Sequence, residues 1–513
     1  MRRTGRAARL VGIGLLLGVM VGGFAPAASA QGGKPAADKP VEVTPRVWRK
    51  QATITLSGRK IAYEARAGTL ILKDESGQPE AEVFHIAYMK KGAKPEKRPI
   101  TFLWNGGPGS ASLWLHMGAF GPKRVVAPSD ARDDGGPPYP IVDNPASLLD
   151  VTDLVFVDPV GTGFSRALGE HKNEEFYGIE ADAKAMARFI RRFLSLTGRW
   201  NSPKFIGGES YGTTRTAAVV HELEGGVDDV AVNGLILIST ILDFSARAEV
   251  PGNEMAYVIL LPTMAATAWY HGKVTPRPPL ETFLDEARRF AAGPYLQALM
   301  KGSALTDPER SRVRARLAYF TGLSETYLER ARLRVGLFRY MKELLRDRGL
   351  VVGRLDSRYT GRDADDAGER PEMDPAFYGI DGIYTAAINH YLRRNLGVDW
   401  EREYRTIKGL GARWDWKLRD MRRPFYLNLA PFIGQALRQN RDLGVFVAAG
   451  WYDFATPFFG AELALSRPGI PQDRIAFHYY PAGHMMYVEE GSLARLAEDL
   501  RRFIRSHTHP PRP

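Results

Sequence analysis

Three residues of this sequence have the chemistry to cleave an acyl bond together. Ser210 lies in Gly-Gly-Glu-Ser-Tyr-Gly at 207–212, Asp453 follows Gly-Trp-Tyr, and His484 follows Pro-Ala-Gly. A serine hydroxyl is a weak nucleophile unless an imidazole takes its proton, and the imidazole needs a carboxylate to fix its tautomer. The three residues therefore predict a Ser-His-Asp triad and an acyl-enzyme that water resolves. The alternatives are that Asp453 only caps a helix and that His484 is structural.

The sequence around Ser210 is typical of a nucleophile elbow. G-x-S-x-G follows the short apolar run 204–206 and precedes 213–223, which is predicted as a helix. The glycines permit a sharp turn, so that the serine hydroxyl points off the tip of the sheet. The pattern alone is weak and needs support from the rest of the chain.

A glycine-rich loop offers backbone donors for the same reaction. Residues 105–110 read Asn-Gly-Gly-Pro-Gly-Ser and follow the apolar run 99–104. The loop lacks the Gly-Lys-Ser/Thr of a phosphate-binding loop. Its small residues let N–H groups approach a reacting carbonyl oxygen, so we interpret it as part of an oxyanion hole.

The elements that must position these residues follow from the pattern of apolar runs. Two or three antiparallel strands are expected over 52–89, and a helix with one apolar face over 180–196. The predicted buried strands are 99–104, 153–158, 204–206, 235–238, 444–449 and 475–480. Buried strands alternating with helices predict a mostly parallel sheet with helices on both faces. The order Ser, Asp, His, each after a strand, predicts the α/β-hydrolase fold.

The alternation stops over 242–440, where helix formers and arginines dominate and 306–309 has the composition of a capping box. We expect a mainly helical cap insertion there, over the catalytic face, with a separate domain as the alternative. It divides the hydrolase core into 46–241 and 441–506, and 507–513 is a tail.

The first 30 residues have the three parts of a secretory signal peptide. Arginines come first, an apolar run reaches about Phe24, and Ala28-Ser29-Ala30 ends the segment. An uncleaved anchor is the alternative, although a membrane span needs about 20 apolar residues. Residues 31–45 are predicted as a flexible leader. We expect an exported protein, periplasmic or secreted, with no stable membrane span after cleavage.

Composition narrows the function classes. The chain has no cysteine, which excludes disulfides, thiol catalysis and thiolate metal sites, and its histidines lack metal-ligand spacing. We therefore predict no cofactor and no metal. The net charge of +12 favours anionic surfaces, but an exported chain without a nucleic-acid motif is not expected to bind nucleic acid. The oligomeric state is left open.

At these motifs the sequence resembles the serine carboxypeptidase family, in a bacterial branch without disulfides. The likeness is carried by 105–110, 208–212 and 482–485, with support from 144–147 and 158–165, and it does not extend to the insertion. The resemblance implies that Ser210, Asp453 and His484 form the triad and that the substrate is a peptide with a free C-terminus.

The resemblance also implies roles for four neighbours of the triad. Gly107 and Tyr211 would supply the oxyanion N–H groups, and Asn105 and Glu209 would bind the terminal carboxylate of the peptide. Two carboxylates in contact cannot both ionise cheaply, so one proton must be shared and peptidase activity is expected to be best in acid. The alternative is that Glu209 only buttresses the elbow, as in some esterases.

Three positions depart from the family's pattern. Trp104 stands one residue later than the family's tryptophan, so it is expected to face away from the pocket. Ser110 replaces a cysteine and Tyr487 replaces a proline after the histidine. These differences bear on substrate choice more than on reaction type.

The sequence thus predicts an exported serine carboxypeptidase. The first alternative is an esterase or acyltransferase using the same triad, and the second is a non-catalytic protein that binds peptides in the cell envelope. The preferred side chains at the cleavage site are not predicted.

Overall fold

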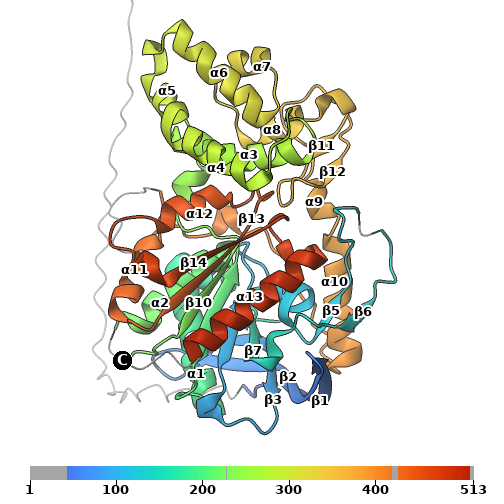
Figure 1. Cartoon of the computed structure of the whole chain (residues 1–513). Helices are drawn as coiled ribbons and strands as arrows, with labels where there is room; N and C mark the ends of the chain where they lie inside the picture. Colours follow the sequence, from blue (N-terminus) through green and yellow to red (C-terminus); the bar gives the residue numbers. More distant parts are fainter. Residues whose placement is uncertain (1–42, 134, 227, 419–425, 509–513) are drawn as a thin grey trace, which may run out of the picture. The chain divides into compact units, whose positions relative to one another are not determined.

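A ten-stranded sheet organises the part of the chain that the computed structural model describes, residues 43–133, 135–226, 228–418 and 426–508 (Figure 1). Its order is β1-β2-β3-β7-β4-β9-β10-β13-β14, with β8 paired to β3. The strands are β1 Val47–Leu56, β2 Arg59–Lys73, β3 Pro79–Lys90, β4 Ile100–Trp104, β7 Asp153–Val157, β8 Arg166–Ala167, β9 Lys204–Glu209, β10 Gly234–Ile238, β13 Gly444–Gly450 and β14 Ile475–Tyr480. The predicted signal peptide, and the predicted leader as far as residue 42, lie outside the described residues.

The pairing of the strands changes once across the sheet, from antiparallel to parallel. β1, β2 and β3 are antiparallel, and β3 is also antiparallel to β7. From β7 to β14 every neighbouring pair is parallel. The predicted antiparallel strands and parallel sheet are both confirmed.

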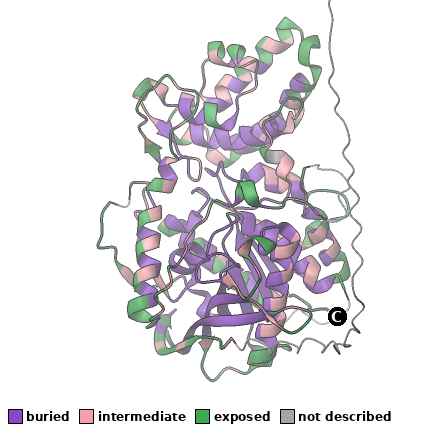
Figure 2. Cartoon of the chain, turned by 180° about the vertical axis from the view of Figure 1, so that it is seen from behind, coloured by how far each residue is buried: buried purple, intermediate pink, exposed green. Residues whose placement is uncertain are grey.

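Helices cover both faces of the sheet, which explains why its central strands are buried along their whole length. Every residue of β4, β7, β10 and β13 is buried, as the purple strands of Figure 2 show. Phe102 packs with helices α1 (Ile179–Thr197), α2 (Tyr211–Glu224) and α11 (Ala430–Gln439) on one face. Its neighbour Leu103 packs in the cluster of α13 (Glu490–Thr508) on the other, because successive side chains alternate. This is an α/β-hydrolase fold, as predicted.

Trp104 follows the same alternation. It is fully buried beneath α2, where its Nε1–H donates to the Gly212 carbonyl at 2.9 Å and to the Thr216 hydroxyl at 3.1 Å. The indole therefore faces away from the catalytic edge, as the one-residue shift predicts.

The range 242–440, predicted as a helical cap insertion, contains two groups of helices that pack on different surfaces. The first group forms a hydrophobic cluster with Trp451, Tyr452 and Phe454, beyond the end of β13 (Figure 1). Its helices are α3 Met255–Tyr270, α4 Leu280–Phe290, α5 Leu296–Lys301, α6 Asp307–Thr321, α7 Glu325–Arg330 and α8 Leu337–Glu343. The capping box predicted at 306–309 begins α6.

The second group packs against the core of the sheet. Residues of α9 (Pro375–Tyr378) and α10 (Asp381–His390) join the cluster that contains α13, and α11 packs on α2. The boundaries 242 and 440 therefore remain a sequence prediction, since the packing changes inside that range.

The remaining elements are short. Helix α12 spans Phe458–Leu465, and two small antiparallel ribbons are formed by β5 (Lys123–Val125) with β6 (Ile141–Asp143) and by β11 (Val351–Val352) with β12 (Thr360–Gly361). None of the helices in the described ranges is both long enough and apolar enough to cross a membrane.

Candidate active site

Ser210 occupies a strained turn between β9 and α2. Its φ of 61° and ψ of −129° lie where residues with a side chain are rare, and such strain persists only when the surroundings enforce it. The Ser210 N–H is held by the Ile238 carbonyl at 3.0 Å, at the end of β10. The serine is partly exposed while β9 is buried, so the turn presents it at the edge of the sheet.

Glycines let the neighbouring backbone come close to this turn. A Cβ on Gly106 would lie 2.6 Å from the Tyr211 nitrogen, and one on Gly208 would lie 2.3 Å from the Gly212 oxygen. Neither position has room for a side chain. The glycine-rich loop after β4 is therefore in direct contact with the first turn of α2.

Asp453 and His484 lie after the next two strands, β13 and β14, and form a hydrogen-bonded pair. The His484 Nδ1 is 2.7 Å from Asp453 Oδ2. Oδ2 also accepts the Thr456 hydroxyl at 2.6 Å, and Oδ1 accepts the backbone N–H groups of Ala455 at 2.7 Å and Thr456 at 3.0 Å. These donors hold the carboxylate in place. Its contact with Nδ1 fixes the proton of a neutral imidazole on that nitrogen and leaves Nε2 free to act as a base.

The charge balance around His484 favours its protonated form. Burial by itself lowers the pKa of His484, but the charge and hydrogen bond of Asp453 outweigh it, and the pKa lies above its ordinary value. Glu209 raises the pKa further and Arg354 opposes this. The arrangement thus supports an imidazolium, the state that a general base reaches after taking a proton.

The structure brings Ser210 and His484 to the same edge of the sheet without a direct bond. In the described part of the chain the two side chains share no hydrogen bond. The His484 carbonyl accepts the hydroxyl of Ser239 at 2.6 Å, immediately after β10, and so ties the histidine loop beside the elbow. Nucleophile and base often draw together only when substrate binds.

The two predicted oxyanion donors belong to the segments that touch at Gly106. Tyr211 is the first residue of α2, so its N–H has no partner within the helix. Gly107 follows Gly106 with a φ of 102°, a conformation that side chains rarely adopt. The Asn105 carbonyl next to this loop accepts Arg215 Nη1–H of α2 at 2.6 Å, which fixes the loop against the helix.

Glu209 and Asn105, predicted to bind a carboxylate, are in contact with each other. Asn105 Nδ2–H donates to Glu209 Oε1 at 3.1 Å, and the Tyr487 hydroxyl donates to Oε2 at 2.6 Å. All three side chains are buried. Burial raises the pKa of Glu209 to about 7, with His484, Tyr487 and Asn105 acting in the opposite direction. Glu209 therefore changes protonation near neutrality, next to the serine.

Sequence reasoning missed two of these partners. Tyr487 registers in the sequence only as a departure from the family's pattern, because nothing in its spacing indicates that it would reach Glu209. Thr456 stands three residues after Asp453, a spacing that permits a hydroxyl to return to the carboxylate, so an Asp-x-x-Thr pattern could have indicated it.

A segment of the insertion, residues 353–358, holds the histidine loop. The Leu355 carbonyl accepts the His484 N–H at 2.6 Å, and Asp356 Oδ2 accepts the Gly483 N–H at 3.0 Å. Asp356 is itself paired with Arg358, whose guanidinium reaches the Pro481 carbonyl at 3.2 Å. This segment of the predicted insertion therefore contributes directly to the position of His484.

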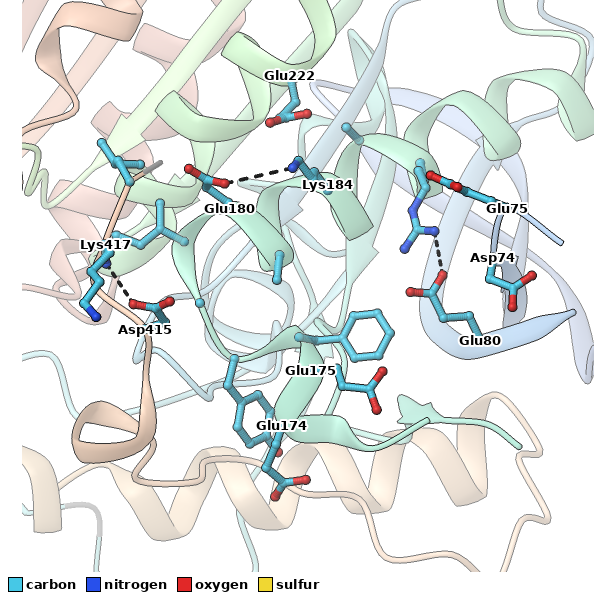
Figure 3. A pocket seen from close by; sticks show the side chains of 18 of the residues that line it. Asp74, Glu75, Glu80, Glu174, Glu175, Glu180, Lys184, Glu222, Asp415 and Lys417 are labelled. Carbon is cyan, nitrogen blue, oxygen red and sulfur yellow. Dashed lines mark hydrogen bonds and ion pairs between the residues drawn. The ribbon is translucent and has the colours of Figure 1, made fainter. Parts of the chain in front are cut away.

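A hollow of about 1000 Å³ elsewhere on the surface contains none of the predicted site residues (Figure 3). Its labelled acids include Asp74, Glu75, Glu80, Glu174, Glu175, Glu180, Glu222 and Asp415. Several are neutralised locally, as Glu80 is by Arg188 and Glu180 by Lys184. It offers no serine beside a histidine, so the edge at Ser210 is the candidate active site.

The fold and this edge define an α/β-hydrolase-fold protein with a serine at its nucleophile elbow. Residues 63–248 match the family model of the serine carboxypeptidases. This range contains the glycine-rich loop and the elbow, whereas Asp453 and His484 lie outside it. The match supports a serine hydrolase, and it supports the predicted resemblance over this part of the chain.

Curated relatives match part of the chain. Serine carboxypeptidase-like 13 of Arabidopsis thaliana is 26% identical over 185 residues, 36% of this chain and 41% of that protein. Serine carboxypeptidase-like 44 of the same plant is 29% identical over 160 residues, 30% of this chain and 29% of that protein. The matches thus span less than half the length of these relatives.

Among solved structures, the chain is similar to proline iminopeptidase from Mycobacterium smegmatis, with a TM-score of 0.36 and 13% identity over 86% of this chain and 98% of that one. A monoglyceride lipase variant from Saccharomyces cerevisiae gives a TM-score of 0.35 and 12% identity, with 86% and 95% covered. These likenesses are too low to bear on function.

Proposed function

We propose that the protein is an exported serine carboxypeptidase that removes C-terminal residues from peptides. The observation that carries this proposal is the buried contact of Glu209 with Asn105 directly beside Ser210. A carboxyl group with a pKa near 7 next to the nucleophile has the chemistry to share a proton with the carboxylate at a chain end.

In the proposed reaction the Ser210 hydroxyl attacks the carbonyl of the last peptide bond while His484 Nε2 takes its proton. The N–H groups of Gly107 and Tyr211 stabilise the oxyanion of the tetrahedral intermediate. His484 returns the proton to the leaving amino acid, and Asp453 stabilises the imidazolium that exists in between. Water then attacks the acyl-enzyme with His484 as the base again.

One observation favours the alternative, an esterase or acyltransferase. Both oxygens of Glu209 are bonded to protein groups, Oε1 to Asn105 and Oε2 to Tyr487. A carboxylate so occupied could serve only to support the elbow. A substrate carboxylate that binds Glu209 must share it with these two groups, of which the Asn105 amide, at 3.1 Å, is the more distant.

The pH dependence of peptide and ester hydrolysis tests the proposal. We expect kcat/KM for a peptide with a free C-terminus to fall as pH rises through about 7, because the proton shared by Glu209 and the substrate is lost. A neutral ester has no carboxylate, so its hydrolysis should lack this alkaline limb. In Glu209→Gln the fall of kcat/KM for the peptide above pH 7 should disappear.

Ser210→Ala, which should not be labelled by a fluorophosphonate, is the control for the nucleophile. Ester turnover without release of any C-terminal residue from a peptide library would favour the alternative. Absence of labelling in the wild type would favour a non-catalytic protein. Export is tested separately, by the N-terminal sequence of the mature protein, expected to begin near residue 31.

A further inference from the structure

Two arginines at the active site have no part in the reaction described above. Arg354 belongs to the 353–358 segment that holds the histidine loop. Arg247 ends a 3₁₀ turn at Phe244–Arg247, on the connection that follows β10. The two residues thus approach the catalytic edge on different loops.

Backbone hydrogen bonds place Arg354 between the acid and the base. Its carbonyl accepts the N–H of Phe454, the residue after Asp453, at 3.0 Å. The carbonyl of the next residue, Leu355, accepts the His484 N–H at 2.6 Å. The Arg354 side chain is 29% exposed and therefore remains open to solvent or a ligand.

Arg354 is weakly neutralised. Its Nε lies 3.7 Å from Asp374 Oδ2, which is too long for a hydrogen bond. The oxygens of Asp374 instead accept three backbone N–H groups, those of Arg354 at 2.8 Å, Leu355 at 3.1 Å and Ala376 at 3.1 Å. Most of the hydrogen-bonding capacity of Asp374 is therefore used by the backbone.

Arg247 lies within electrostatic range of Arg354 and Asp453. Burial lowers the pKa of Arg247, the nearby Arg354 guanidinium lowers it further, and Asp453 opposes both. The residue is nevertheless exposed at the surface, where a ligand can reach it. Within the described ranges Arg247 has no ion-pair partner.

The carboxylates of the triad and of the elbow are already engaged. Asp453 holds His484, and both oxygens of Glu209 are bonded by Asn105 and Tyr487. Two guanidinium groups within electrostatic range of each other repel, and an anion between them would relieve the repulsion. Guanidinium groups bind carboxylates with particularly favourable geometry.

We propose that Arg247 and Arg354 form a subsite for an acidic side chain of the substrate, the carboxylate of an Asp or Glu next to the scissile bond. This inference rests on the proposed function in one respect, that the triad cleaves a substrate with such a side chain. The terminal carboxylate is assigned to Asn105 and Glu209, so the arginines serve a second carboxylate.

Matched peptides test the subsite. Two pairs of peptides with free C-termini are compared, and each pair consists of a Glu peptide and a Gln peptide that are otherwise identical. In one pair the substituted residue is the last one, and in the other pair it is the residue before the last. We expect the wild type to favour Glu by roughly 10-fold or more in kcat/KM in one pair, since a hydrogen bond to a charged group is worth about that much. Arg247→Met and Arg354→Met should each reduce this ratio toward one, and Arg354→Lys should restore part of it.

Arg312→Met, on exposed α6, is the matched control and should keep the wild-type ratio. Melting temperatures of all variants show whether they fold. Equal rates on Glu and Gln peptides in the wild type would overturn the subsite. Equal losses on both peptides in the arginine variants, with neutral esters unaffected, would assign the arginines to the chain end and also overturn it.

Esters separate the subsite from the peptidase activity. p-Nitrophenyl hydrogen succinate carries an anionic acyl group, and p-nitrophenyl acetate is its neutral counterpart. If no peptide is cleaved but the succinate ester is preferred, and this preference is lost in Arg247→Met and Arg354→Met, the carboxypeptidase proposal fails and the anionic subsite stands. If the arginine variants slow both esters equally, the arginines act on the triad and the subsite is overturned.

Discussion

The base and the nucleophile of the candidate site are held in different ways. His484 is bonded through its ring to Asp453 and through its backbone to Ser239 and Leu355, three contacts from three separate segments. Ser210 is held through its backbone alone, in a strained conformation between β9 and α2. The base is fixed by hydrogen bonds of its ring and backbone, and the nucleophile by backbone hydrogen bonds and by the close packing of glycines around its turn.

This difference indicates how the histidine loop and the elbow at Ser210 should each respond to substitution. Removing one hydrogen bond at the histidine should lower the rate while the fold persists, because the other contacts remain. Adding a single methyl group at the elbow should displace backbone, because glycine positions there have no spare volume. The predictions below test this distinction, from the largest expected effect to the smallest.

Asp453→Asn should lower kcat by about 10⁴-fold, the loss seen when an amide replaces a triad carboxylate and favours the wrong imidazole tautomer. The melting temperature should change little, since an asparagine oxygen can still accept the N–H groups of Ala455 and Thr456. Kinetics on an activated ester and thermal unfolding check both parts. If kcat of the variant stayed within 10-fold of the wild-type value, the assignment of Asp453 to the triad would be wrong.

Gly106→Ala should lower both activity and stability. Its Cβ would lie 2.6 Å from the backbone nitrogen of Tyr211 and 2.7 Å from the backbone carbonyl oxygen of Glu209, so the loop and the elbow must move apart. We expect a loss of about 1–3 kcal/mol in the free energy of unfolding, typical of overpacking, together with a lower kcat.

The control for this variant is Gly409→Ala, where an added Cβ meets no atom within 4 Å. If Gly106→Ala unfolded at the same denaturant concentration as Gly409→Ala and kept full activity, steric control of the nucleophile would be refuted.

Thr456→Val should lower kcat by roughly 10-fold without loss of fold, because Asp453 loses one hydroxyl donor of a charged hydrogen bond. Thr456→Ser keeps the hydroxyl and should recover most of the rate. Steady-state kinetics give kcat of both variants for this comparison. Equal rates for Val and Ser would mean that the hydroxyl does not support the acid.

Glu209→Gln should act on stability, with a gain that grows with pH. Below pH 4.5 the carboxyl is protonated in both folded and unfolded chains, so it adds no pH dependence. As pH rises toward about 7 the unfolded chain loses this proton first, which destabilises the wild type, and the penalty is complete above pH 7. Melting temperatures should therefore favour the variant more at pH 8 than at pH 4. A difference that stayed constant with pH would contradict the raised pKa of Glu209.

Much of the fold could be predicted from the sequence, because strands that are buried on both faces of a sheet have continuous apolar sequences. The same runs locate Ser210, Asp453 and His484 after strand ends. The position of Trp104 could be predicted as well, since the alternation of side chains along a strand is strict.

The contacts of the 353–358 segment could not be predicted. The composition of 354–374 favours a solvent-exposed loop, yet Asp356 and Arg358 are buried, at 6% and 8% exposure. Each charge tolerates burial because it is paired with the other, and that pairing depends on packing against the distant histidine loop. Neither a period nor a motif records such a contact.

The participation of the 353–358 segment also sets the order in which the site can be completed during synthesis. The elbow leaves the ribosome well before the histidine loop, and the segment that holds this loop comes between them in the chain. A partly synthesised chain that ends before β14 can present the serine turn but has no base to activate it. Hydrolytic power would therefore be acquired in one late step, after the insertion has folded, which would limit unwanted cleavage by an unfinished enzyme.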